Sequence, residues 1–126
     1  MPGIDMKADL QIELLKKALL PRLSSFYREG FDGVVIHSSS IVICADAGCA
    51  EMFGYTEEEM VGINAWSHFK PECARTLLQH LTEKSEEPYT VTALNRNREE
   101  FEVELKGKDF TVNGIPVRAV LLRKLS

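Results

Sequence analysis

The sequence lacks several features, and each absence excludes a class of protein. It has three cysteines among 126 residues, an odd number without regular spacing. No disulfide framework is therefore expected, and free thiols in a reducing cytoplasm are the plain interpretation. No apolar run approaches the length of a membrane span, and no cleavable signal is visible. We therefore expect a cytoplasmic protein without a membrane partner.

Positive charge is also scarce. The chain has 15 Lys and Arg against 19 Asp and Glu, which gives a formal net charge of −4. A surface that binds nucleic acid needs a basic patch to neutralise phosphates, so this balance argues against a nucleic-acid partner. Hydrophobic residues make up 44% and charged residues 27%, as is ordinary for a globular protein, and the length suits one domain.

Motifs for catalysis and metal binding are missing as well. There is no Gly-x-Ser-x-Gly and no carboxylate dyad on adjacent turns, so we expect no enzyme. Cys44 and Cys49 fall on a predicted strand and the following helix, without a second Cys/His pair at zinc spacing. They are expected to be buried small hydrophobic residues, and no metal site is predicted.

The stretch 32–62 carries the strongest local signals. The β-branched run Val34-Val35-Ile36 predicts a buried strand, Ser38-Ser39-Ser40 a turn, and Ile41-Val42-Ile43 a second strand that pairs back. Asp46 stands where a helix N-cap belongs, and Gly54 is expected to end that helix in a left-handed conformation. Thr56 with Glu59 three residues later predicts a capping box.

The second half of the chain predicts one longer helix and three strands. Pro71 is expected to open a helix that runs to about Lys84. Alternation predicts strands over 89–94 and around 100–105, joined by a turn in which Asn97 takes a left-handed conformation. Asn113-Gly114 is a hairpin signal before the last strand, 115–122. The fold class is therefore α+β, with helices on one face of an antiparallel sheet.

Residues 1–29 form a separate flanking segment, and 30–126 the domain. Apolar residues at helical spacing predict a helix that Pro21 ends or kinks. Two interpretations compete: this helix packs on its own sheet, or it pairs with its twin in a homodimer. The residues expected in such a dimer helix are Ile12, Leu15, Leu19, Leu23 and Phe26.

The ordered combination of Asp32-Gly33, Asp46-Ala47, Phe53-Gly54-Tyr55 and 58–62 (Glu-Glu-Met-Val-Gly) resembles the PAS domain family. Asp46 stands where the family usually has Asn, and either side chain can cap a helix. The resemblance implies a five-stranded antiparallel sheet in the order 2-1-5-4-3, a pocket between the sheet and the short helices, and often a flanking dimer helix.

The resemblance and the apolar pattern together give a set of residues expected to line the pocket. These are Ile36, Ile43, Met52, Phe53, Trp66, His68, Phe69, Leu77, His80, Leu81, Val91, Phe101, Val103, Val117 and Ala119. All but the histidines would equally fill a plain core. No cationic pair suited to a carboxylate ligand is apparent on the inner face, and no polar set is identified.

Two cofactors can be considered from the resemblance. Some PAS sensors hold haem iron through a histidine on the long helix, where this chain has His80, although a histidine at the solvent edge is the competing interpretation. Flavin-binding photoreceptor relatives need a cysteine where this chain has Ala65, so a covalent flavin adduct is not expected. The sequence does not identify a cofactor, and it favours a domain that has no obligatory cofactor.

The resemblance implies a sensory and signal-transduction module. It would bind a small ligand or a protein partner and relay the change to an effector, within a larger signalling protein such as a two-component system. Many PAS domains end in Asp-(Ile/Val)-Thr, where this chain has Lys124-Leu125-Ser126. The alternatives are a structural dimerisation module without a ligand, a haem-based gas or redox sensor and, more distantly, a small α+β enzyme.

Overall fold

The computed structural model describes residues 14, 17, 30–112 and 114–125. Leu14 and Lys17 are helical. The rest of the predicted flanking helix lies outside the described residues, and so do its dimer candidates, Ile12, Leu15, Leu19, Leu23 and Phe26.

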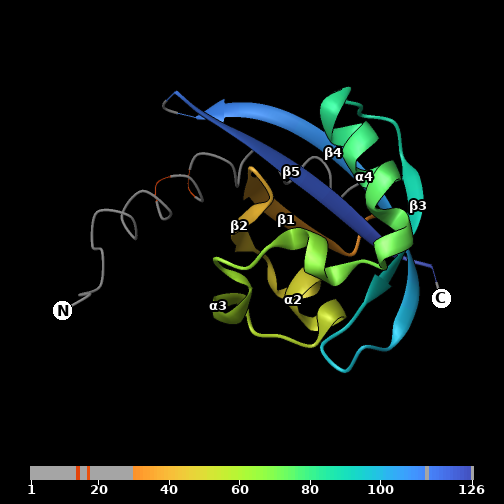
Figure 1. The fold of residues 1–126 in the computed structure, drawn as a ribbon. Helices are drawn as coiled ribbons and strands as arrows, with labels where there is room; N and C mark the ends of the chain where they lie inside the picture. Colours follow the sequence, from red (N-terminus) through yellow and green to blue (C-terminus); the bar gives the residue numbers. More distant parts are fainter. Residues whose placement is uncertain (1–13, 15–16, 18–29, 113, 126) are drawn as a thin grey trace.

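One antiparallel sheet of five strands organises the domain (Figure 1). The strands are β1 (Gly33–Ser38), β2 (Ile41–Ala45), β3 (Tyr89–Leu94), β4 (Glu100–Val112) and β5 (Ile115–Lys124). Their spatial order is β2-β1-β5-β4-β3, so the last strand of the chain lies in the middle of the sheet. The predicted fold class and strand order are confirmed.

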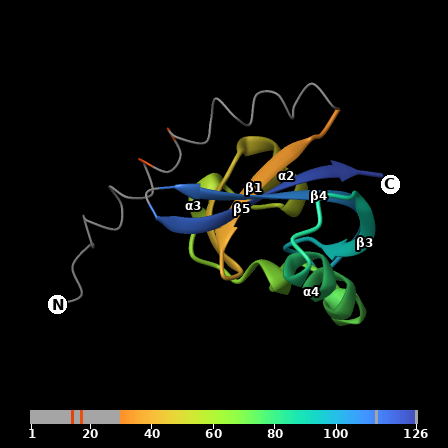
Figure 2. The same cartoon turned by 90° about the horizontal axis from the view of Figure 1, so that it is seen from above.

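The helices lie between β2 and β3 in the chain. They are α2 (Ala47–Phe53), α3 (Glu57–Met60), the 3₁₀ turns η1 (Ala65–His68) and η2 (Pro71–Cys73), and α4 (Ala74–Thr82). In Figure 2 α4 stands clear of the sheet on one side. Pro71 opens η2 as its first residue, so the helix expected over 71–84 is a short 3₁₀ turn followed by a shorter α-helix.

The predicted helix caps are confirmed. Asp46 Oδ1 accepts hydrogen bonds from the backbone N–H of Cys49 at 2.9 Å and of Val34 at 3.0 Å, so it ties α2 to β1. Gly54 has φ +85° and ends α2 in the left-handed region. Thr56 and Glu59 form a reciprocal capping box at the start of α3.

Two turn predictions are confirmed and one is wrong. Ser39 and Ser40 both have positive φ, as the two-residue connection of the β1–β2 hairpin requires. Val112 pairs with Ile115 across the β4–β5 hairpin. In the loop after β3, however, Arg98 rather than Asn97 has positive φ (+64°). Asn95 controls this loop instead, because its Oδ1 accepts from the backbone N–H of Asn97 and of Glu99.

Buried apolar residues form two clusters. The inner cluster lies between the sheet and the helices and includes Val35, Val91 and Val103 from the strands and Phe53 and Met60 from α2 and α3. The outer cluster belongs to the opposite face of the sheet; its buried members are Phe31, Val34, Ile36, Cys44, Val112, Val117, Ala119 and Leu121. Neighbouring residues of β1 and β5 therefore belong to different clusters.

Candidate functional site

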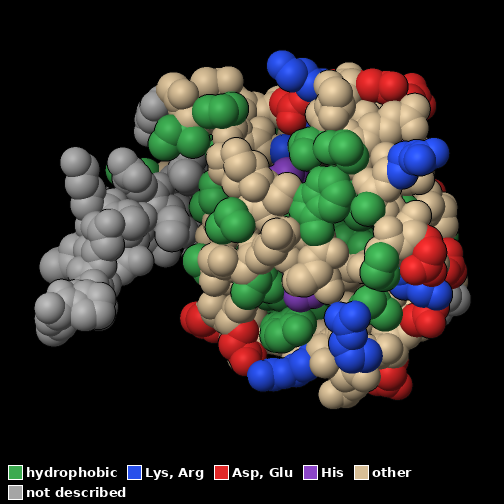
Figure 3. All heavy atoms as spheres, in the orientation of Figure 1, with side chains coloured by type: hydrophobic (Ala, Val, Ile, Leu, Met, Phe, Trp, Pro, Cys, Tyr) green, Lys and Arg blue, Asp and Glu red, His purple; other side chains and the backbone are tan. Residues whose placement is uncertain are grey.

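A small cavity lies between the inner face of the sheet, η1 and α4. Its volume is about 60 Å³, enough for a few water molecules or a molecule of a few heavy atoms. The cavity is lined by Val35, His37, Ala65, Trp66, Phe69, Leu77, Leu81, Tyr89, Leu105, Arg118, Val120 and Leu122. On the surface seen in Figure 3, apolar side chains gather in the middle of the face and charged ones lie mainly around its rim.

Apart from His68 and His80, the residues expected in the pocket from sequence divide into three groups. Trp66, Phe69, Leu77 and Leu81 line the cavity. A second group packs in or against the inner cluster without lining the cavity; it consists of Met52, Phe53, Val91, Phe101 and Val103.

A third group lies on the wrong face of the sheet. Ile36, Val117 and Ala119 are members of the outer cluster, and Ile43 packs against it. The assignment of these four residues to the pocket is corrected because side chains alternate along a strand. The true inner residues of β1 are Val35 and His37, and those of β5 begin with Arg118.

His68 lies beside the cavity within a cage of aromatic rings. Its ring centroid is 5.0 Å from that of Phe53 and 5.4 Å from that of Tyr55, and the residue is 6% exposed. Burial lowers the pKa of His68 below its ordinary value, and the positive charge of Arg98 lowers it further. His68 is therefore held neutral as a structural aromatic residue and does not line the cavity.

His80 does not project into the cavity either. Its ring is stacked on Tyr89, with 3.6 Å between centroids and 9° between planes. A haem needs a ligand set that faces a pocket of several hundred cubic ångströms, by the general scale of ligand sites. This cavity of about 60 Å³ and this stacked histidine do not fit the group.

The polar residues of the cavity escaped the sequence analysis, which found no cationic pair suited to a carboxylate on the inner face and identified no polar set. Arg118 lies opposite Asp109 on β4 and opposite His37 on β1, so the three form one row across neighbouring strands. The Asn113-Gly114 hairpin signal could have revealed the pair. A two-residue loop there fixes the β4–β5 register and makes Asp109 face Arg118.

Arg118 is buried, with 5% of its surface exposed. Its Nη1 lies 3.1 Å from Asp109 Oδ1, and its Nη2 donates a hydrogen bond to the carbonyl oxygen of Ser85 at 2.5 Å. Gly107 leaves the space for this guanidinium, since a Cβ there would lie within 2.2–2.5 Å of three of its atoms. Burying a charge costs free energy unless it is paired, and these contacts offset part of that cost.

His37 adds a second polar group beside Arg118. Its Nδ1 accepts a hydrogen bond from the backbone N–H of Ser40 at 3.3 Å, so the neutral ring carries its proton on Nε2. Burial lowers the pKa of His37, and the charge of Arg118 lowers it further, while Asp109 opposes the shift. Ser40 in turn accepts a hydrogen bond at Oγ from Trp66 Nε1, which ties the β1–β2 turn to η1.

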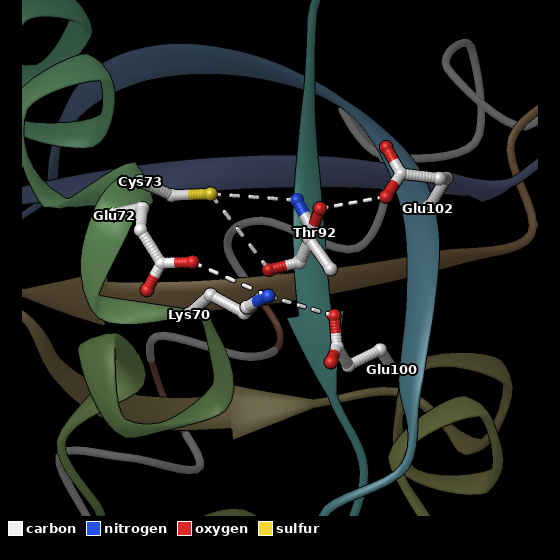
Figure 4. A network of polar contacts seen from close by, with 6 residues as sticks. All are labelled: Lys70, Glu72, Cys73, Thr92, Glu100 and Glu102. Atoms are coloured by element: carbon white, nitrogen blue, oxygen red, sulfur yellow. Dashed lines mark hydrogen bonds and ion pairs between the residues drawn. The ribbon is translucent and has the colours of Figure 1, made fainter.

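The helix α4, with the η2 turn before it, is tied to the sheet near both ends. Near its beginning, Cys73 Sγ accepts from the N–H of Thr92 and donates to the carbonyl of the same residue, as Figure 4 shows. Lys70 pairs there with Glu72 at 3.2 Å and Glu100 at 2.9 Å. Beyond its end, Ser85 is held by Arg118. The helix α4 therefore covers the cavity and is attached to the sheet near its beginning and beyond its end.

Other chemical sites were sought in the described part of the chain. Cys44, Cys49 and Cys73 are free thiols, and burial raises the pKa of Cys49 far above its ordinary value, so its thiol stays protonated. No group of three or more metal-binding side chains occurs among these residues. Nor does any helix here have the length and apolar character needed to cross a membrane.

Comparison with known proteins gives a family match and many similar folds. Residues 32–121 match the family described as PAS domain. A PAS domain from a two-component sensor histidine kinase aligns at TM-score 0.66 and 10% identity, covering 98% of this chain and 100% of that one. A light-oxygen-voltage domain studied with a flavin analogue aligns at TM-score 0.70 and 16% identity, with 86% and 88% covered.

A third similar structure is PAS-B of Cycle from Drosophila melanogaster with bound ethylene glycol. It aligns at TM-score 0.64 and 12% identity, covering 74% of this chain and 99% of that chain. No curated protein matches the sequence. At these identities the structures show a shared fold alone. The family match spans most of the chain and agrees with the observed strand order, and the chain therefore belongs to the PAS domain family.

Proposed function

We propose that this domain is a sensory module whose internal cavity binds a small molecule and whose state is relayed to an effector. PAS domains generally act as sensory or signalling modules. The observation that carries the proposal is the cavity beside the buried Arg118 and His37. A core that only had to be filled would gain nothing from a buried cation next to empty space, whereas apolar pockets with a few convergent polar groups are typical ligand sites.

The strand β5 offers a route from the cavity to a partner. Arg118 and Val120 face the cavity, while Val117, Ala119 and Leu121 belong to the outer cluster. A ligand that moves Arg118 therefore displaces the same strand whose other side forms the outer apolar face. The ligand acts only through its different affinity for the two arrangements of β5 and α4.

The proposal extends to the assembly. We place the domain in the cytoplasm, as a homodimer that pairs through its flanking segment and acts on an effector within a larger signalling protein. The likeness to a PAS domain from a sensor histidine kinase makes a two-component system the first assembly to examine.

A purely structural dimerisation module is the second candidate, and the small size of the cavity, about 60 Å³, favours it. Such a module needs no ligand, so blocking the cavity would leave its association with partners unchanged.

Native mass spectrometry of freshly purified protein, with an absorbance scan of the same sample, separates the two candidates. We expect a retained small mass in the natural protein and its loss in Val120→Phe, because the larger side chain fills the cavity. Leu78→Ala is the matched control, since Leu78 is 52% exposed on α4 and does not line the cavity. Bare masses for all three, with unchanged partner binding in Val120→Phe, favour the structural module.

A further inference from the structure

The polar groups that line the cavity are mainly hydrogen-bond donors. His37 lines the cavity and carries its proton on Nε2, because its Nδ1 already accepts from the backbone N–H of Ser40. Arg118 can only donate, and Tyr89 contributes a hydroxyl group. The indole N–H of Trp66 is already engaged with Ser40. Because Arg118 and His37 can only donate here, a molecule that contacts them needs to supply hydrogen-bond acceptors.

The guanidinium of Arg118 is incompletely satisfied. The side chain is 5% exposed, and its buried Nη1 has no hydrogen bond, although Asp109 Oδ1 lies 3.1 Å away as an ion-pair partner. The Asp109 side chain is 37% exposed and belongs to an open groove beside the cavity rather than to the cavity itself. An anion that contacts Arg118 from within the cavity would pair with a buried cation whose ion-pair partner, Asp109, is partly solvated.

The remaining wall of the cavity is apolar. Val35, Leu105, Val120 and Leu122 from the sheet face Leu77 and Leu81 from α4. The open groove shares His37, Leu81 and Arg118 with the cavity and adds Lys84, so the donor end lies next to solvent. This arrangement complements a molecule with one anionic end and a short aliphatic body.

We propose that the ligand is a short-chain carboxylate, bound with its carboxylate on Arg118 and His37 and its alkyl part against the apolar wall. This inference rests on the proposed function and names the ligand class of the same cavity. The cavity of about 60 Å³ encloses only a few heavy atoms, so the alkyl part of propionate, butyrate or isobutyrate lies inside it and the carboxylate lies where the cavity meets the open groove, beside Arg118 and His37.

The test is a titration of the purified chain with butyrate and isobutyrate, followed by two-dimensional amide NMR. Butyramide and butanol serve as neutral probes of nearly the same shape. We expect butyrate to shift the amide signals of cavity residues and both neutral probes to bind about tenfold or more weakly, because they forfeit a charge-assisted contact. Equal binding of butyramide and butanol would overturn the carboxylate class while leaving a small-molecule site in place.

Two variants sharpen the test. Arg118→Gln should weaken butyrate binding about tenfold or more, whereas Arg75→Gln, which removes a cation from an exposed position of α4, should not change it. Asp109→Asn should strengthen binding by about threefold, because it removes the competing carboxylate, and it keeps the test open if Arg118→Gln does not fold. Unchanged affinity in Asp109→Asn, or no response to any carboxylate, would overturn the inference. Retention of another small mass in the native spectra would still support the proposed function.

Discussion

Gly107 on β4 provides the space that the guanidinium of Arg118 on β5 occupies. A Cβ at Gly107 would lie 2.2 Å from Nη2 of Arg118, closer than any real contact allows. The absence of one side chain on β4 therefore lets a cation lie flat inside the domain, between Asp109 and the carbonyl of Ser85. The polar end of the cavity depends on this pair.

Gly107→Ala should lower the free energy of unfolding by roughly 1–3 kcal/mol, because the added methyl group forces the guanidinium out of its position. Urea unfolding measures the loss. In an Arg118→Leu background the same change should cost much less, since the two residues are in contact and their effects are not additive. An equal cost in both backgrounds would show that Gly107 is needed for another reason.

Gly54→Val should destabilise the domain by about 1 kcal/mol or more. Gly54 has φ +85° at the end of α2, where a β-branched side chain is strained. Gly54→Asn is the matched control, because Asn adopts the left-handed region more readily and should cost less. Equal melting temperatures for the natural protein and Gly54→Val would contradict the role of Gly54 as a left-handed cap.

His68 should make the domain sensitive to acid. Its pKa is lowered in the folded state, so as the pH falls through about 6.5 the unfolded chain takes up a proton that the folded chain does not. The contribution of His68 is therefore constant above that pH and is lost as the pH falls toward the folded pKa. His68→Phe should flatten the dependence of the free energy of unfolding on pH between about pH 7 and pH 5.

The slope should decrease in His68→Phe without vanishing, because His37 also has a lowered pKa. His37 faces Arg118 and Asp109, whereas Arg98 acts on His68, so the two contributions are separate. Chemical denaturation at a series of pH values gives the slopes. The same slope in both proteins would mean that His68 does not titrate differently in the folded and unfolded states.

Leu15→Glu combined with Leu19→Glu should convert the protein from a homodimer to a monomer, if the flanking helix predicted from the sequence is the dimer seam. Charges within an apolar helix pair are costly to bury. Sedimentation velocity distinguishes the two species. Unchanged sedimentation of the double variant would exclude this helix as the seam, and Leu14→Glu, at a position that is 47% exposed, is the control.

Most of the fold could be predicted from local signals. In β4, charged and buried residues alternate over 100–105. The sequence therefore predicted which side chains of this strand are buried, namely Phe101, Val103 and Leu105. The capping residues and hairpin turns set element boundaries in the same way, since each carries its own hydrogen-bonding requirement. The left-handed residue of the loop after β3 was misplaced by one position, and the helix expected over 71–84 is a 3₁₀ turn followed by an α-helix that ends at Thr82.

The cavity could be predicted only in part, because the sheet is buried on both faces at its centre. β1 reads Val34-Val35-Ile36 and β5 is apolar at Val120-Leu121-Leu122, so alternation gives no choice of face. From sequence, the polar Arg118 and His37 would be expected to face solvent. They face inward because His37, Arg118 and Asp109 lie opposite one another on neighbouring strands, where Asp109 pairs with the charge of Arg118. Trp66, Phe69, Leu77 and Leu81 were expected in the pocket and line the cavity, whereas Ala65 lines it without having been expected.

Amide NMR of the natural protein against a library of small molecules tests the central claim most directly. The account predicts that at least one class of molecule shifts the signals of cavity residues such as Val35 and Leu105, and that Val120→Phe abolishes those shifts while Leu78→Ala retains them. A library that leaves the cavity residues of the natural protein unchanged, or shifts Val120→Phe equally, would contradict a ligand-sensing cavity.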